Sequence, residues 1–188
     1  MHSIDRAIAN YQKIIDMNGG ENCIIYYKCM ANLAIINDDL CVLIRNLNNK
    51  EKDGYSYGMQ VGNLLLKLFE IKLWIDKSFN KNVYILVRDT EIMDRIFAWF
   101  KEEKAKANYN SINQFSKIRD KLLGHYDDMA CDYLIELGKI NLTEFIQIAE
   151  SFQRLVLSLI SILHEIGIYH GGIAAQKGDA PGSAPPDR

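Results

Sequence analysis

Proline is almost missing from this sequence. The chain has 188 residues and three prolines, and all three fall within the last eight residues, at Pro181, Pro185 and Pro186. Proline removes a backbone donor and clashes with the preceding turn, so it breaks helix interiors. Residues 1–180 contain none, and so long a stretch without proline is typical of a body made of long helices.

Paired cysteines are also missing. The four cysteines are Cys23, Cys29, Cys41 and Cys131, and no two of them form a C-x-x-C motif. The first three lie within apolar helical patterns, which predicts buried thiols rather than disulfides or zinc ligands. The sequence offers no clustered set of histidine, cysteine and aspartate suited to a metal. We therefore expect no metal ion and no cofactor.

The chain has little excess charge and no long apolar run. Its formal net charge is −2, which gives no global attraction to nucleic acid, so any such contact would need a local basic cluster. The longest strongly apolar stretch, LVLSLISIL at 155–163, is much shorter than the roughly 20 residues of a membrane span. The N-terminus lacks the apolar run of a secretory signal. We expect a soluble, cytoplasmic protein without a membrane span.

Glycine and asparagine clusters divide the chain into helical segments. They lie at 18–22, 46–58, 79–82 and 108–111, and residues 137–145 introduce a last helix with Asn141 or Thr143 as its candidate cap. Residues 82–87 are ambiguous between strand and helix, and their continuation favours helix. The sequence predicts an all-α bundle of about five to six helices, forming a single domain over residues 1–172. The tail at 173–188 is rich in Gly, Ala, Pro and Ser and should be disordered.

Three helices show apolar residues at helical spacing. The third has Val61, Leu65, Leu68, Phe69, Leu73 and Ile75, and the fourth has Ile92, Met93, Ile96, Trp99 and Phe100. The last has Phe145, Ile148, Phe152, Leu155, Leu159, Ile162 and Ile166. We expect these residues to form the core. The stretch KEEKAKAN at 101–108 mixes both charge signs and is most simply a solvated helix end.

The segment SKIRDKLLGHYDD at 116–128 places an arginine and a histidine close together in an amphipathic helix. Ile112, Phe115, Ile118 and Leu122 form its apolar stripe, and His125 is the next member. Arg119 and His125 are six residues apart, roughly 9 Å in rise and 120° around the axis, so on one straight helix they do not face the same point. Spacing alone leaves two interpretations open. The pair is either a site or a core-edge histidine and a solvated arginine.

The stretch IRDKLLGH resembles the signature of the HEPN superfamily (higher eukaryotes and prokaryotes nucleotide-binding domain). Arg119 matches its arginine, Asp120 its polar follower and His125 its histidine, with five residues between. The resemblance implies an all-α bundle in which the motif lies late, on a helix followed by at least one more. The RDK at 119–121 is similar to the abortive-infection branch of that superfamily.

The resemblance further implies a metal-independent endoribonuclease that cuts single-stranded RNA through its 2′-hydroxyl. His125 would be the general acid or base, because histidine moves protons near neutral pH. Arg119 would clamp the phosphate with its planar guanidinium. Asp120 could orient the arginine or the histidine, and Lys121 could add a phosphate contact. The family usually forms its cleft at a homodimer interface, where motifs from two chains meet.

Tyr126 follows the histidine directly. It could stack on a base, or be modified by a partner nucleotidyltransferase as in some toxin–antitoxin relatives, or be a plain half-buried tyrosine. Those relatives place their tyrosine one residue further from the histidine.

Three functions remain open at this stage. The chain could be the ribonuclease toxin of a defence or toxin–antitoxin system, with an antitoxin as its partner. It could be a non-catalytic module of the same fold that binds nucleotide, RNA or a protein, or an unrelated helical interaction protein.

Overall fold

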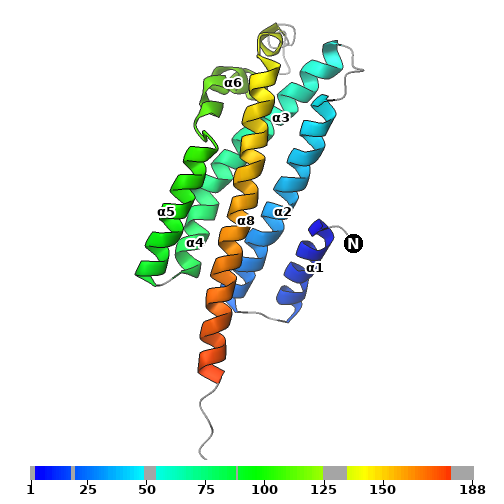
Figure 1. The fold of residues 1–188 in the computed structure, drawn as a ribbon. Coiled ribbons are helices and arrows are strands. Elements are labelled where there is room, and N and C mark those ends of the chain that lie inside the picture. Colours follow the sequence, from blue (N-terminus) through cyan, green and yellow to red (C-terminus); the bar gives the residue numbers. More distant parts are fainter. Residues whose placement is uncertain (1–2, 18–19, 49–53, 88, 125–134, 179–188) are drawn as a thin grey trace, which may run out of the picture.

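The computed structural model describes residues 3–17, 20–48, 54–87, 89–124 and 135–178. These residues form an elongated bundle of helices (Figure 1) and include no β-strand. Its elements are α1 (Ser3–Asp16), α2 (Glu21–Asn48), α3 (Gly54–Trp74), one turn of π-helix (Ile75–Phe79, called the π-turn below), α4 (Asn80–Leu86), α5 (Thr90–Lys106), a 3₁₀ helix (Ser111–Phe115), α6 (Ser116–Gly124) and α8 (Leu142–Gly178). The prediction of a single all-α domain is confirmed.

The long helix α8 runs through the middle of the bundle, where it contacts α2, α3 and α5 (Figure 1). All seven apolar residues predicted for its core face are at most 7% exposed. Asn141 is its cap, because the Asn141 side-chain oxygen accepts a hydrogen bond from the Glu144 backbone amide at 3.3 Å. A continuous apolar stripe packed on three partners makes α8 the main contributor to the core.

Helix α2 packs against α8 on one side and α1 on another. One contact between α2 and α8 is unusually close. A Cβ atom built on Gly167 of α8 would lie 2.6 Å from the Tyr26 hydroxyl oxygen of α2. Glycine at this position therefore lets the N-terminal part of α2 and the C-terminal half of α8 approach each other.

The predicted break at 79–82 is wrong. The helix passes through the π-turn into α4, and the chain turns only at Val87, which has extended backbone angles (φ −109°, ψ 111°). Asn80 and Asn82 lie within this helix, where Asn80 Nδ2 donates to the Asp76 carbonyl oxygen at 3.3 Å and Asn82 Nδ2 donates to Cys29 Sγ at 3.1 Å. Helix α5 then starts from Asp89, whose carboxylate accepts from the Ile92 amide at 3.1 Å.

Two predictions of burial are also wrong. Leu73 is 54% exposed, because the buried face of α3 passes through Ile71, and two residues along a helix correspond to about 200°. Cys23 is exposed near the start of α2, whereas Cys41 is partly buried and Cys29 is fully buried. Burial raises the pKa of the Cys29 thiol, so it remains protonated near neutral pH. Cys131 lies outside the described residues.

The predicted fifth helix begins as a 3₁₀ helix and continues as α6. Three residues per turn bring Ile112 and Phe115 onto one side of the 3₁₀ helix, and both are buried. The Phe115 ring meets the Phe145 ring of α8 edge to face, with 5.5 Å between centroids. These contacts attach the start of α6 to the core and so position the predicted site.

One stretch of the described residues, Leu142–Ile168 of α8, is long and apolar enough to cross a membrane by length and composition. An 18-residue window within it has a mean hydropathy of 1.4 and is 44% buried in the bundle, and the core helix of a soluble protein passes the same criterion. The expected absence of a membrane span stays a prediction. So does the domain boundary at residue 172, since the α8 backbone continues to Gly178 and residues 179–188 lie outside the described part.

Candidate functional site

Arg119 lies on α6 where this helix contacts α3. Its guanidinium carbon is 4.6 Å from the centroid of the Phe69 ring of α3, in a cation–π arrangement. Phe69 is 9% exposed and belongs to the core, whereas the Arg119 side chain is 33% exposed. Arg119 is therefore held against the bundle with part of its surface open, and it is not a fully solvated charge.

Asp120 pairs with Arg119. Arg119 donates to Asp120 Oδ1 through Nε at 2.8 Å and also through Nη2. Adjacent residues on a helix do not face each other, so the long arginine side chain bends back to make this contact. Asp120 is 63% exposed and covers the Nε side of the guanidinium. The Nη1 side points away from this carboxylate and has the planar donor geometry that suits a phosphate oxygen.

The remaining predicted site residues fall largely outside the described part of the chain. His125 and Tyr126 lie in the segment 125–134, which the structure does not describe. Lys121 belongs to the described backbone of α6, but its side chain lies outside the described residues. The structure thus brings Arg119 and Asp120 together, and the geometry of Arg119 relative to His125 stays a prediction.

Sequence reasoning missed the contribution of Phe69 to this site. The residue was assigned correctly to the apolar face of the third helix, but the spacing of a helix cannot reveal that a cation 50 positions later lies on its ring. Sequence reasoning also gave no role to Lys72 of α3, although an aromatic residue at i and a lysine at i+3, here Phe69 and Lys72, share one side of a helix. That local pattern is the only signal that could have drawn attention to it.

Among the residues that the structure describes, no three His, Cys, Asp or Glu side chains gather where they could hold a metal ion. The site therefore consists, in its described part, of one guanidinium, one carboxylate and one aromatic ring. Such a set can bind and neutralise an oxyanion, and proton transfer near neutral pH would need a further group.

Comparison of the chain with protein-family models, with curated proteins and with solved structures gives no match.

Proposed function

We propose that this protein is a metal-independent endoribonuclease of HEPN type that cuts single-stranded RNA. The observation that carries the proposal is the placement of Arg119, whose guanidinium lies against a core aromatic ring and pairs with Asp120 while its side chain stays 33% exposed. The R-D-K-x-x-x-H spacing of residues 119–125 and the all-α body agree with the motif and the fold of that superfamily.

The proposed reaction is attack of the RNA 2′-oxygen on the adjacent phosphorus, with release of the 5′-oxygen of the next nucleotide. His125 accepts the proton of the 2′-hydroxyl as general base or returns a proton to the leaving 5′-oxygen as general acid. Arg119 neutralises the charge that grows on the phosphorane oxygens. Asp120 orients Arg119, Lys121 adds a phosphate contact, and Tyr126 stacks on a base.

We further propose that the active form is a cytoplasmic homodimer with a composite cleft. On one straight helix Arg119 and His125 would diverge by about 120°, and motifs from two chains facing each other would remove this difficulty. The biological setting that fits such a ribonuclease is a defence or toxin–antitoxin system, in which an antitoxin or a nucleotidyltransferase restrains the activity.

A second candidate is a non-catalytic module of the same fold that binds nucleotide, RNA or a protein partner. The pairing of Arg119 with Asp120 favours it, because the carboxylate reduces the positive charge left to stabilise a phosphorane during cleavage. The net charge of −2 points in the same direction.

The test is cleavage of a labelled RNA mixture in EDTA by the wild type, Arg119→Ala and His125→Ala, with the fold checked by circular dichroism. Arg154→Ala is the matched control, because Arg154 is an exposed arginine of α8 that contacts only Ser151 among the interactions of described residues. The proposal expects cutting by the wild type and the control, and its loss in both motif variants. A wild type that binds RNA without cutting it would favour the second candidate.

A further inference from the structure

A second group of charged side chains surrounds a cavity between the end of α3 and the end of α5. The cavity has a volume of about 380 Å³, at the small end of the range for ligand sites. Its lining, called the lysine pocket below, consists of Lys72, Asp76, Lys101, Lys104, Ala105, Asn108, Tyr109 and Asn110. Three ammonium groups face one carboxylate here, so the pocket is a local basic cluster in a chain of slight negative charge.

Two of the ammonium groups are held in place within the protein. Lys104 Nζ lies 2.8 Å from Asp76 Oδ1, and Lys72 Nζ lies 3.4 Å from Asp76 Oδ2. Both lie over the Tyr109 ring, at 4.4 and 4.0 Å from its centroid. Their side chains are only 17% (Lys72) and 23% (Lys104) exposed. Because these donors are ordered before a ligand arrives, binding an anion would cost little further side-chain entropy.

Tyr109 fixes this arrangement to the core. Its hydroxyl donates to the Lys72 carbonyl oxygen at 2.9 Å, and its ring stacks on Phe152 with 5.4 Å between centroids. Burial, and secondarily the Asp76 carboxylate, raises the pKa of Tyr109, so the hydroxyl keeps its proton and stays a donor. Asp76 itself belongs to the π-turn, and such turns occur frequently at functional sites.

The donors that remain suit a phosphate group. Lys101 is exposed, and Asn110 accepts from Lys72 Nζ through Oδ1 at 3.3 Å, which leaves its amide nitrogen as a donor. The two acidic residues between Lys101 and Lys104 do not compete, because Glu102 and Glu103 pair with Lys106, and Glu103 also accepts from Ser158. Neither acidic residue lines the cavity.

The lysine pocket and the Arg119 site share helix α3 as a support. Phe69, which carries Arg119, and Lys72 are three residues apart, about 4.5 Å in rise and 60° around the axis. Asp76 follows about two turns beyond Phe69 on nearly the same side. The segment from Asn108 to Arg119 links the two sites through the 3₁₀ helix and the start of α6.

We propose that the lysine pocket binds phosphate groups of a single-stranded RNA that continues from Arg119 along α3. The choice of RNA as ligand rests on the proposed function. Arg119 and the lysine pocket, together called the track below, would offer one cation to the reacting phosphate and three more to neighbouring phosphates.

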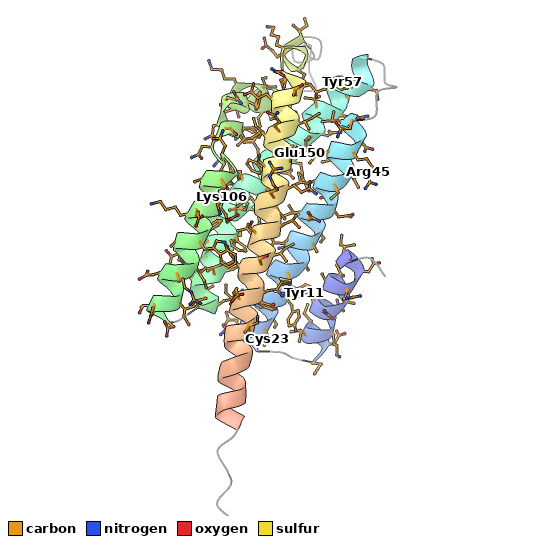
Figure 2. The ribbon with its side chains drawn as sticks, in the orientation of Figure 1. Tyr11, Cys23, Arg45, Tyr57, Lys106 and Glu150 are labelled. Carbon is orange, nitrogen blue, oxygen red and sulfur yellow. The ribbon has the colours of Figure 1, made fainter. Side chains whose placement is uncertain are left out.

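The test measures binding and cleavage separately. Binding is followed by fluorescence anisotropy with a short single-stranded oligonucleotide whose 2′-hydroxyls are methylated, so that it cannot be cut, between about 50 and 200 mM salt. Lys101→Gln is the main variant, because Lys101 is exposed and its loss should leave the fold intact. Lys104→Gln is the second. Lys106→Gln is the matched control, on the same helix but outside the pocket; Figure 2 labels this residue.

We expect Lys101→Gln and Lys104→Gln each to weaken binding several-fold. Each should also make the slope of log K against log salt less negative by about 0.7, whereas the control should leave affinity and slope unchanged. Equal binding by Lys101→Gln and the wild type, or equal weakening by the control, would overturn the inference while leaving RNA cleavage by the wild type untouched. Binding of inorganic phosphate that depends on Lys101, without such dependence for the oligonucleotide, would also overturn it and identify a free anion as the ligand. If the oligonucleotide binds as expected but the wild type cuts no RNA, the proposed reaction fails and the track stands.

Discussion

The buried face of α8 and the lysine pocket lie on opposite sides of one aromatic ring. Phe152 of α8 stacks on one face of Tyr109, and the ammonium groups of Lys72 and Lys104 lie over the same ring from the pocket. The face of α8 is wholly apolar and almost fully buried, whereas the pocket is held by ion pairs and remains open to solvent. Burial of apolar surface stabilises the face of α8, whereas ion pairs hold the side chains of the pocket. Substitutions in the two regions should therefore change the free energy of unfolding by different amounts.

The largest effect is expected on the apolar side, from Phe152→Ala. Phe152 is 0% exposed, so removing its ring leaves a cavity and should lower the free energy of unfolding by about 3–5 kcal/mol. Urea unfolding measures this change. Leu157→Ala is the control on the same helix, since Leu157 is 47% exposed and should alter stability by no more than about 0.5 kcal/mol. A similar loss in both variants would mean that α8 does not present its apolar stripe to the core.

A smaller effect is expected at the ring that joins the two regions. Tyr109→Phe keeps the contacts of the ring with Phe152 and the two lysines. It removes the hydroxyl that donates to the Lys72 carbonyl, which should lower the free energy of unfolding by about 1 kcal/mol at neutral pH. Burial and the Asp76 carboxylate raise the pKa of Tyr109 in the folded protein. The unfolded chain therefore ionises this tyrosine first, near its ordinary pKa of 10.0, and stability falls as the pH rises past that value.

Unfolding of Tyr109→Phe and the wild type at neutral pH and above pH 10 separates the two contributions. The variant should be less stable at neutral pH and should lose less stability on the move to alkaline pH. Tyr84→Phe is the control, because Tyr84 is 58% exposed. An alkaline loss of the same size in Tyr109→Phe and the wild type would contradict the raised pKa of Tyr109, and equal stability at neutral pH would contradict the hydrogen bond.

The smallest effect is expected inside the pocket, from Asp76→Asn. Partial burial alone would raise the pKa of Asp76, but the ammonium groups of Lys104 and Lys72 outweigh it and hold the pKa below its ordinary value of 3.8. A lowered pKa contributes stability that is present above the ordinary value and is lost as the pH falls below it. The wild type should therefore lose stability on acidification below pH 3.8 more steeply than Asp76→Asn.

Acid titration followed by circular dichroism checks this difference, with Asp94→Asn on the exposed side of α5 as the control. The effect should be small because Asp76 is 41% exposed and solvent screens its ion pairs. Identical acid transitions for Asp76→Asn and the wild type would show that the ion pairs of Asp76 with Lys72 and Lys104 add nothing to the stability of the fold.

The fold was predictable where local pattern and tertiary environment agree. The apolar steps from Phe145 to Ile166 predicted the core face of α8 correctly, because helix periodicity and burial demand the same residues. The prediction failed at 79–82, where asparagine is ambiguous. A turn and a helix interior can both accommodate this residue, and the helical placement of Asn82 brings it to Cys29, 53 positions away in the sequence.

The sites show the same division. The sequence alone proposed Arg119 and Asp120 as site residues from their spacing to His125, and this assignment stays a prediction. It described residues 101–108 as a solvated helix end, which suits Lys106 and its pairs with Glu102 and Glu103. Lys104 departs from that description, because it pairs with Asp76 across the bundle.

By itself, then, the sequence determined that this chain is helical, which side of α8 is buried and where a candidate motif lies, since each of these depends on neighbours within a few turns. Only the tertiary structure showed that Arg119 lies on the Phe69 ring and that Asp76, in the π-turn, forms ion pairs with two lysines. The pairing of Lys104 with Asp76 spans 28 positions and the contact of Arg119 with Phe69 spans 50. The apolar packing that brings such residues together has no counterpart in the local order of the chain.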